Sequence, residues 1–367
     1  MPKKFFFIIF VLFINSFDVA KSEEFVSYCP AVSKEEFIKG SEGYDCSSDI
    51  MSSEETKSVE LVRPLNIEFD KIEKINIPVQ NISDESFDLN RIQLAAASTT
   101  ATLGIFSPLL TKVEKGGIWF RPYSTFENIP LNNGPTVKSI SYGALVGIDS
   151  DLKNLKKKWQ RVNSGYLGYT GSRQSYNSVK QTQLSGFSGF YSTFYRNNFF
   201  SAVVLTAGGN VVKSNDSQDI VAVHAGLITR TGYNLKFPHH LVFQPNYIMS
   251  YTFDNTFDYR NNRGELVEES PLNIIHIVPS VRFFAELKDG WQPFFIVNMA
   301  FNILCSGDVT VNYAALPMTS VKPYVEYGGG VQKLSKGKFS TFIQVLAKSG
   351  GRNGVSILAG FRWAFNK

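Results

Sequence analysis

The last thirteen residues of the chain, 355–367, alternate between two kinds of side chain. One face carries no charge and is rich in aromatic residues, whereas the other includes Ser356, Gly360 and Arg362. A period of two indicates a β-strand with one apolar face. Such a strand suits a barrel that turns one face to lipid and the other to a lumen, and a half-buried strand of a soluble sandwich would look the same. The apolar face consists of Val355, Ile357, Ala359, Phe361, Trp363 and Phe365.

The N-terminus, residues 1–22, is typical of a secretory signal peptide. Lys3 and Lys4 precede an apolar run over residues 5–17, and Ala20-Lys21-Ser22 provides a small-x-small cleavage site. A membrane anchor is the alternative, but the run is shorter than the roughly 20 residues that a spanning helix needs. No later stretch approaches 18 consecutive apolar residues. If this exported chain enters a membrane, it must therefore do so as a closed β-barrel.

Charge divides the chain into two parts. Residues 23–88 hold 16 acidic and six basic residues, whereas residues 89–367 hold 28 basic and 15 acidic ones. Such asymmetry marks a boundary between parts with different roles. We do not expect the basic part to bind nucleic acid, because the protein is exported. Basic side chains in turns, in a lumen and against anionic lipid explain the surplus better.

The chain has three cysteines. Cys29 and Cys46 lie in the acidic segment of an exported protein and are a candidate disulfide, which would leave Cys305 free. No metal-ligand spacing is present, so we expect neither a metal nor another cofactor. His224 and His276 fall in predicted strands outside any catalytic motif, and we expect no enzymatic activity.

Turn signals separate twelve candidate strands between about Gly117 and the C-terminus. Their alternating faces predict an all-β fold, a twelve-stranded antiparallel transmembrane β-barrel over residues 113–367. The strands centre on residues 117–126, 140–149, 160–170, 180–194, 198–212, 218–231, 241–254, 272–285, 292–304, 320–333, 338–347 and 354–365.

The predicted connections alternate in length. Those after even-numbered strands are short, as at 195–197 and 287–290, whereas most of those after odd-numbered strands are longer, as at 171–179 and 255–272. Short periplasmic turns and long outer loops are typical of bacterial outer-membrane barrels. A soluble β-protein has no reason to keep this alternation.

A thin helix is predicted just before the first strand, in a linker over residues 84–112. Asp84 and Glu85 suit its first turn, and Pro108 lies beyond its end. Its small side chains would allow it to fit inside a twelve-stranded barrel, and a surface helix is the alternative. The candidate pore-helix residues are Ile92, Leu94, Ala95, Ala96, Ala97, Ser98 and Thr99.

Several runs together resemble the C-terminal translocator domain of autotransporters, the type V secretion barrels. The resemblance covers roughly residues 90–367 and implies a pore threaded by the N-terminal helix. It also implies that a terminal strand with Phe361, Trp363 and Phe365 is read by the barrel-assembly machinery, although Asn366 and Lys367 follow where family members usually end. The runs are residues 117–123, 142–149, 243–247, 322–332, 351–354 and 360–363.

The resemblance also implies a function. The barrel would export its own short segment, residues 23–83, and anchor it on the surface of a Gram-negative-type outer membrane. Lumen charges such as Glu326 and Arg362 would hold the helix by hydrogen bonds. Outer-membrane lipid, the assembly machinery and periplasmic chaperones are the expected partners of a monomeric barrel. A passive porin-like channel is the alternative, and a barrel enzyme acting on lipid is a more remote one.

Overall fold

The computed structural model describes residues 115–365, apart from 131–135, 177–178, 216, 307–308, 312–313, 317–321 and 335–338. No helix in these ranges is long and apolar enough to cross a membrane. The predicted signal peptide, the acidic segment with Cys29 and Cys46, and the pore helix with Ile92 and residues 94–99 lie outside the described residues.

Twelve long strands make up most of the described chain, and each pairs antiparallel with the next in sequence. This confirms the predicted strand number and order. The strands are β1 (Gly117–Pro130), β2 (Thr136–Asp149), β4 (Gln160–Tyr176), β5 (Val179–Arg196), β6 (Phe199–Ser214), β7 (Ile220–Tyr233), β9 (Leu241–Thr256), β12 (Leu272–Ala285), β13 (Trp291–Ser306), β16 (Tyr324–Leu334), β17 (Phe339–Gly350) and β18 (Asn353–Ala364).

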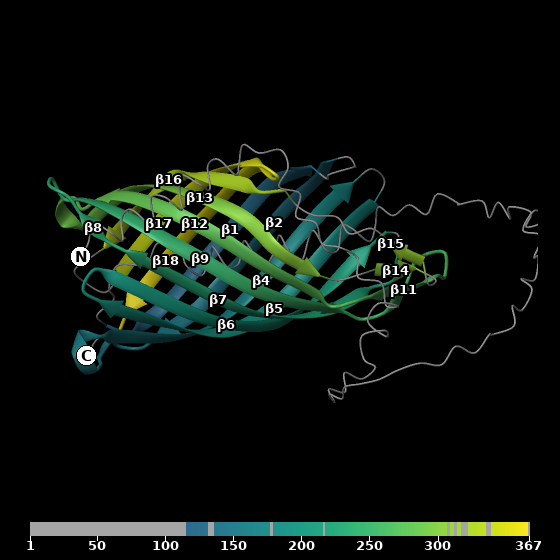
Figure 1. The fold of residues 1–367 in the computed structure, drawn as a ribbon, viewed down its shortest axis with the longest axis horizontal. Helices are drawn as coiled ribbons and strands as arrows, with labels where there is room; N and C mark the ends of the chain where they lie inside the picture. Colours follow the sequence, from purple (N-terminus) through teal and green to yellow (C-terminus); the bar gives the residue numbers. More distant parts are fainter. Residues whose placement is uncertain are drawn as a thin grey trace, which may run out of the picture. The chain divides into compact units, whose positions relative to one another are not determined.

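The sheet closes on itself because β1 also pairs with β18. Their register runs from Gly117 opposite Ala364 to Asn128 opposite Asn353. Closure removes the exposed edges that an open sheet would present. The tilted strands lie side by side around the barrel in Figure 1. We call the end where β1 begins and β18 finishes the terminal end, and the opposite one the loop end.

Short elements occupy both ends of the barrel. At the terminal end lie β3 (Lys153–Asn154), η2 (Lys156–Lys158), β8 (Leu235–Lys236) and η3 (Lys288–Gly290). At the loop end, the connections β9–β12 and β13–β16 form a separate four-stranded sheet, labelled at its end of the barrel in Figure 1. That sheet consists of β10 (Tyr259–Arg260), β11 (Leu266–Glu269), β14 (Val309–Val311) and β15 (Ala314–Leu316).

The predicted alternation of loop lengths is correct only in part. The expected long loop at 171–179 is wrong, because β4 continues to Tyr176 and β5 begins at Val179. Its polar residues Ser172 and Gln174 are buried on the inner face of β4. Their polarity therefore reflects a polar lumen, and not a loop.

Side chains of the long strands divide into an apolar outside and a polar inside. On β18, Val355, Ile357, Phe361 and Trp363 are exposed, whereas Arg362 is buried. β9 shows the same pattern, with Tyr247, Met249 and Tyr251 exposed between buried Asn246, Ser250 and Thr252. Pro245 of β9 and Met299 of β13 share the phase of the outward-facing residues of their strands, and both are nevertheless buried.

This distribution is the reverse of that in a soluble barrel. The exposed residues of the strands include many large apolar side chains, and the buried ones include arginine, glutamate, glutamine and serine. An outer apolar band around a polar interior is the arrangement of a barrel whose outside contacts lipid. The terminal strand, ambiguous by its own sequence, is thus the closing strand of a lipid-facing barrel.

A charge on the outer face should destabilise the barrel according to its depth. Leu205 is 56% exposed near the middle of β6, and Leu155 is 40% exposed in the turn between β3 and η2 at the terminal end. We expect Leu205→Arg to lower the free energy of unfolding in lipid vesicles by about 2–4 kcal/mol, and Leu155→Arg by no more than about 1 kcal/mol. Urea titration of both variants measures the difference. Equal losses would contradict a lipid-facing band.

Candidate functional site

A belt of apolar side chains lines the inside of the barrel. Every one of the twelve long strands contributes at least one residue. Such residues, pointing inward among polar neighbours, narrow the lumen along its whole circumference. The belt consists of Trp119, Tyr123, Leu145, Tyr166, Phe187, Ala202, Val204, Ile228, Ile248, Val278, Ala300, Tyr324, Phe342 and Leu358.

A buried charge cluster lies near the loop end. Lys348 Nζ donates to Glu127 Oε2 at 3.1 Å and lies 3.5 Å from Glu326 Oε1. Arg352, in the turn between β17 and β18, lies 3.8 Å from Glu127 Oε2. Asn298 donates to Glu326 at 3.2 Å and accepts from Ser280 at 2.6 Å. Two carboxylates thus share two cations out of contact with solvent. We call Glu127, Glu326, Lys348 and Arg352 the loop-end cluster.

A second cluster gathers at Asp149, the last residue of β2, near the terminal end. Its Oδ1 accepts from Trp119 Nε1 at 2.9 Å, Ser164 Oγ at 2.7 Å and Tyr191 OH at 3.1 Å. Its Oδ2 accepts from Arg362 Nε at 3.1 Å. Arg362 also donates to the Lys115 carbonyl oxygen, just before β1. The carboxylate therefore holds β1, β2, β4, β5 and β18 together.

Local sequence explains how Trp119 reaches this carboxylate. Gly147 lies directly opposite Trp119 on β2. A Cβ at Gly147 would lie 2.2 Å from the indole ring, so the absence of a side chain makes room for it. Asp149 lies two residues further along, on the same inner face, within reach of the indole nitrogen.

Four arginines point inward near the terminal end: Arg121, Arg230, Arg282 and Arg362. Each is at most 6% exposed and lies within five residues of the terminal end of its strand. Arg121 lies over Trp119, with Cζ 4.2 Å from the ring centroid. We call these four residues the arginine quartet.

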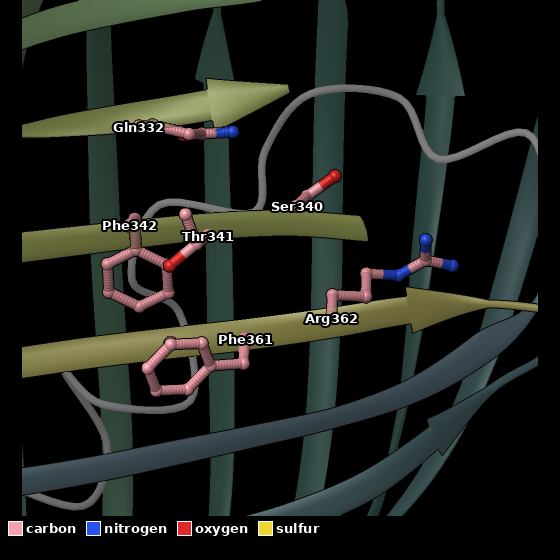
Figure 2. A pocket seen from close by; sticks show the side chains of 7 residues that line it. Gln332, Ser340, Thr341, Phe342, Phe361 and Arg362 are labelled. Atoms are coloured by element: carbon pink, nitrogen blue, oxygen red, sulfur yellow. The ribbon is translucent and has the colours of Figure 1, made fainter. Parts of the chain in front are cut away.

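Figure 2 shows the wall beside Arg362, where β16, β17 and β18 run next to one another. Ser340 is paired with Arg362 across β17 and β18, and Gln332 lies on β16 beyond it. Together with Phe361 and Phe342 these residues surround a gap in the wall that is too narrow to hold water. Polar side chains therefore accompany the arginine on its inner side.

The structure places the sequence-predicted site residues in three locations. Glu326 lies in the loop-end cluster and Arg362 in the Asp149 cluster, so these two charges are not neighbours. Phe361, Trp363 and Phe365 are exposed on the outside, at 44%, 59% and 40%. Any contact of Glu326 or Arg362 with the pore helix stays a prediction, because that segment lies outside the described residues.

Sequence reasoning missed most of the buried charges as site residues. Glu127 and Arg121 share the inward phase of Trp119 along β1, and Arg230 and Arg282 occupy inward positions of β7 and β12. These residues could have been found in the sequence as charged residues at the inward positions of alternating strands. Which charges pair could not be found in this way, because the partners lie far apart in the sequence: Lys348 and Glu127 by 221 positions, and Arg362 and Asp149 by 213.

His224 of β7 lies beside another polar side chain of the lumen wall. His224 Nδ1 lies 3.2 Å from Asn210 Oδ1, and its ring packs near Phe187. Within the described ranges, no group of three or more histidine, cysteine, aspartate or glutamate side chains is arranged to hold a metal ion.

Comparisons with solved structures bear on the fold. The chain is similar to the transport unit of the autotransporter AIDA-I from Escherichia coli, with 16% identity, a TM-score of 0.61 and coverage of 74% of this chain and 97% of that one. It is also similar to the translocator domain of NalP from Neisseria meningitidis, with 11% identity, a TM-score of 0.60 and coverage of 76% and 98%.

A third similar structure is the β-domain of the Bordetella autotransporter BrkA, with 18% identity, a TM-score of 0.56 and coverage of 68% and 100%. No family model and no curated protein sequence matches this chain. The comparisons confirm the predicted resemblance at the level of the fold: the barrel has the architecture of an autotransporter translocator domain.

Removing one charged side chain of the loop-end cluster should destabilise the folded barrel. Lys348→Met would leave Glu127 and Glu326 buried with one cation fewer, and we expect it to lower the free energy of unfolding by about 3–5 kcal/mol. The control is Lys213→Met, because Lys213 faces Asp219 at 3.7 Å with both side chains more than 60% exposed. The control should cost at most about 1 kcal/mol. Denaturant titration of the refolded barrels compares them, and similar losses would contradict a buried network.

Proposed function

We propose that this chain, whose barrel has the fold of an autotransporter translocator domain, is an outer-membrane barrel that exports its own N-terminal segment, residues 23–83, and anchors it at the cell surface. The observation that carries the proposal is the closed barrel with a polar lumen, whose first strand begins at the terminal end. The resemblance in fold to AIDA-I, NalP and BrkA supports it.

The direction of export follows from the ends of the barrel. The longest connections, between β9 and β12 and between β13 and β16, lie at the loop end. Bacterial outer-membrane barrels turn their longer loops outward and their short turns to the periplasm. β1 then begins on the periplasmic side, at Gly117. A segment that precedes β1 and reaches the surface must pass through the lumen.

The lumen wall suits the passage of a polypeptide. Its inner face carries glutamine, serine and threonine side chains, such as Gln181, Ser185 and Thr252. These groups can exchange hydrogen bonds with the peptide units of a passing chain, which would otherwise lose their bonds to water. The proposal includes the pore helix within the linker of residues 84–112, which would stay in the lumen after export. It includes neither a cofactor nor a catalytic step.

The outer surface suggests the remaining partners. Phe361, Trp363 and Phe365 face outward at the end of the chain, where the assembly machinery would read them before lipid covers them. Periplasmic chaperones would escort the apolar strands before that step. A monomer is expected, because a closed sheet leaves no strand edge for a second copy.

Protease treatment of intact cells tests the proposal. An epitope inserted at Ser52 should be lost on addition of an external protease, because residues 23–83 would lie outside the cell. An epitope in the β10–β11 connection should be lost in parallel, since that connection lies at the loop end. Immunoblotting before and after treatment measures both.

The control for an intact envelope is an epitope in the β12–β13 connection, at the terminal end. It should survive until the outer membrane is opened. If the Ser52 epitope survives together with this control, the segment stays in the periplasm. The export proposal then fails, and the passive channel becomes the better interpretation.

A further inference from the structure

The two ends of the lumen differ in the balance of their buried charge. Near the terminal end, the buried charged residues of the described strands are the arginine quartet and one carboxylate, Asp149. Near the loop end, the carboxylates of Glu127, Asp254 and Glu326 accompany the cations of Lys348 and Arg352. The described residues therefore give a surplus of buried positive charge at the terminal end and a near balance of charge at the loop end.

Neutral side chains of the wall hold two members of the quartet in place. Arg230 Nε donates to Asn246 Oδ1 at 2.9 Å. Arg282 donates to Gln332 Oε1 at 3.3 Å and lies over Phe294, with Cζ 4.1 Å from the ring centroid. These contacts orient the guanidinium groups and leave their positive charge in place.

The four arginines lie close enough together for their electric fields to overlap in the lumen at the terminal end. Arg230 and Arg282 are close enough to repel each other, and Arg121 and Arg362 likewise. Tyr195 lies within electrostatic range of Arg230, Arg362 and Asp149 together. Like charges in a low-dielectric wall focus their field into the opening and raise the local concentration of the opposite charge.

The chain itself contains a ligand of the matching sign. Residues 23–88 hold 16 acidic and six basic residues, and they precede β1, which begins at the terminal end. We propose that the arginine quartet is an electrostatic mouth that captures the acidic segment of this chain as the segment enters the lumen. The proposal rests on the export function. The balanced charge at the loop end, where Glu127 and Glu326 share Lys348 and Arg352, would avoid holding the segment once it leaves.

The test compares export rates in cells expressing the full chain. Arg230→Gln with Arg282→Gln removes two charges of the mouth and leaves the Asp149 cluster untouched. We expect the epitope at Ser52 to reach the surface about tenfold more slowly, measured by pulse-labelling and external protease. The matched control, Lys153→Gln with Lys156→Gln, removes the same charge from exposed positions at the same end and should keep the original rate.

Two further variants separate charge from folding. Arg230→Lys with Arg282→Lys keeps the charge and should restore most of the rate. A chain with an intact barrel, in which the acidic residues of 23–83 are replaced by asparagine and glutamine, should be exported as slowly as the double Gln variant. Combining this neutral segment with the double Gln variant should cause little further slowing, because the attraction has already been removed.

The outcomes are distinct from those of the function test. If the unchanged segment never reaches the surface, the export function fails. If the unchanged segment is exported and the neutral segment keeps the same rate, the electrostatic mouth is overturned while the export function stands. A neutral segment that is slow, with no further loss in the double Gln variant, supports the mouth.

Discussion

The pairing of β1 with β18 is the contact on which the rest of the structure depends. A sheet in a bilayer cannot leave backbone N–H and C=O groups unpaired, since each would cost several kcal/mol. Closure gives both terminal strands a partner on each side. It also places the start of β1 and the end of β18 at the same end of the barrel, which fixes the end at which the upstream chain joins β1.

Both buried ion-pair clusters lie across this seam, one near each end. At the loop end, Lys348 of β17 pairs with Glu127 of β1, 221 positions away. At the terminal end, Arg362 of β18 pairs with Asp149 of β2, 213 positions away. Each pair spans the junction between the first and last strands. The charges that make the lumen polar therefore also stabilise the pairing of β1 with β18. Arg230 and Arg282, on β7 and β12, lie away from this seam.

Sequence patterns predicted the strands well because each strand has a lipid face and a lumen face. The alternation of Phe361, Arg362 and Trp363 identifies the outer side of β18 correctly. The same patterns wrongly predicted a loop at 171–179. Polar lumen residues such as Ser172 and Gln174 cannot be told from loop residues in a single sequence. A lumen-facing strand segment and a solvent-exposed loop can have the same polar composition, although the cause of that polarity differs.

The lumen site could be predicted only in part, for a related reason. Arg362 was expected inside from the alternation of the terminal strand and Glu326 from the family resemblance, and both are buried. Their actual partners, Lys348 and Asp149, depend on strand tilt and on which strands meet at the seam, and neither property is written in a local pattern. The Asp149 cluster further depends on Gly147, whose missing side chain admits the Trp119 ring.

The central claim is that the N-terminal segment passes through this lumen, and photo-cross-linking from adjacent positions of β18 tests it most directly. Leu358 is buried in the apolar belt, whereas Ile357 is 40% exposed on the outer face. A photoreactive residue in place of Leu358 should cross-link to residues 23–83 of the same chain during export, and the same residue in place of Ile357 should not. Cross-links from Ile357 alone, or from neither position while the segment reaches the surface, would contradict passage through the lumen.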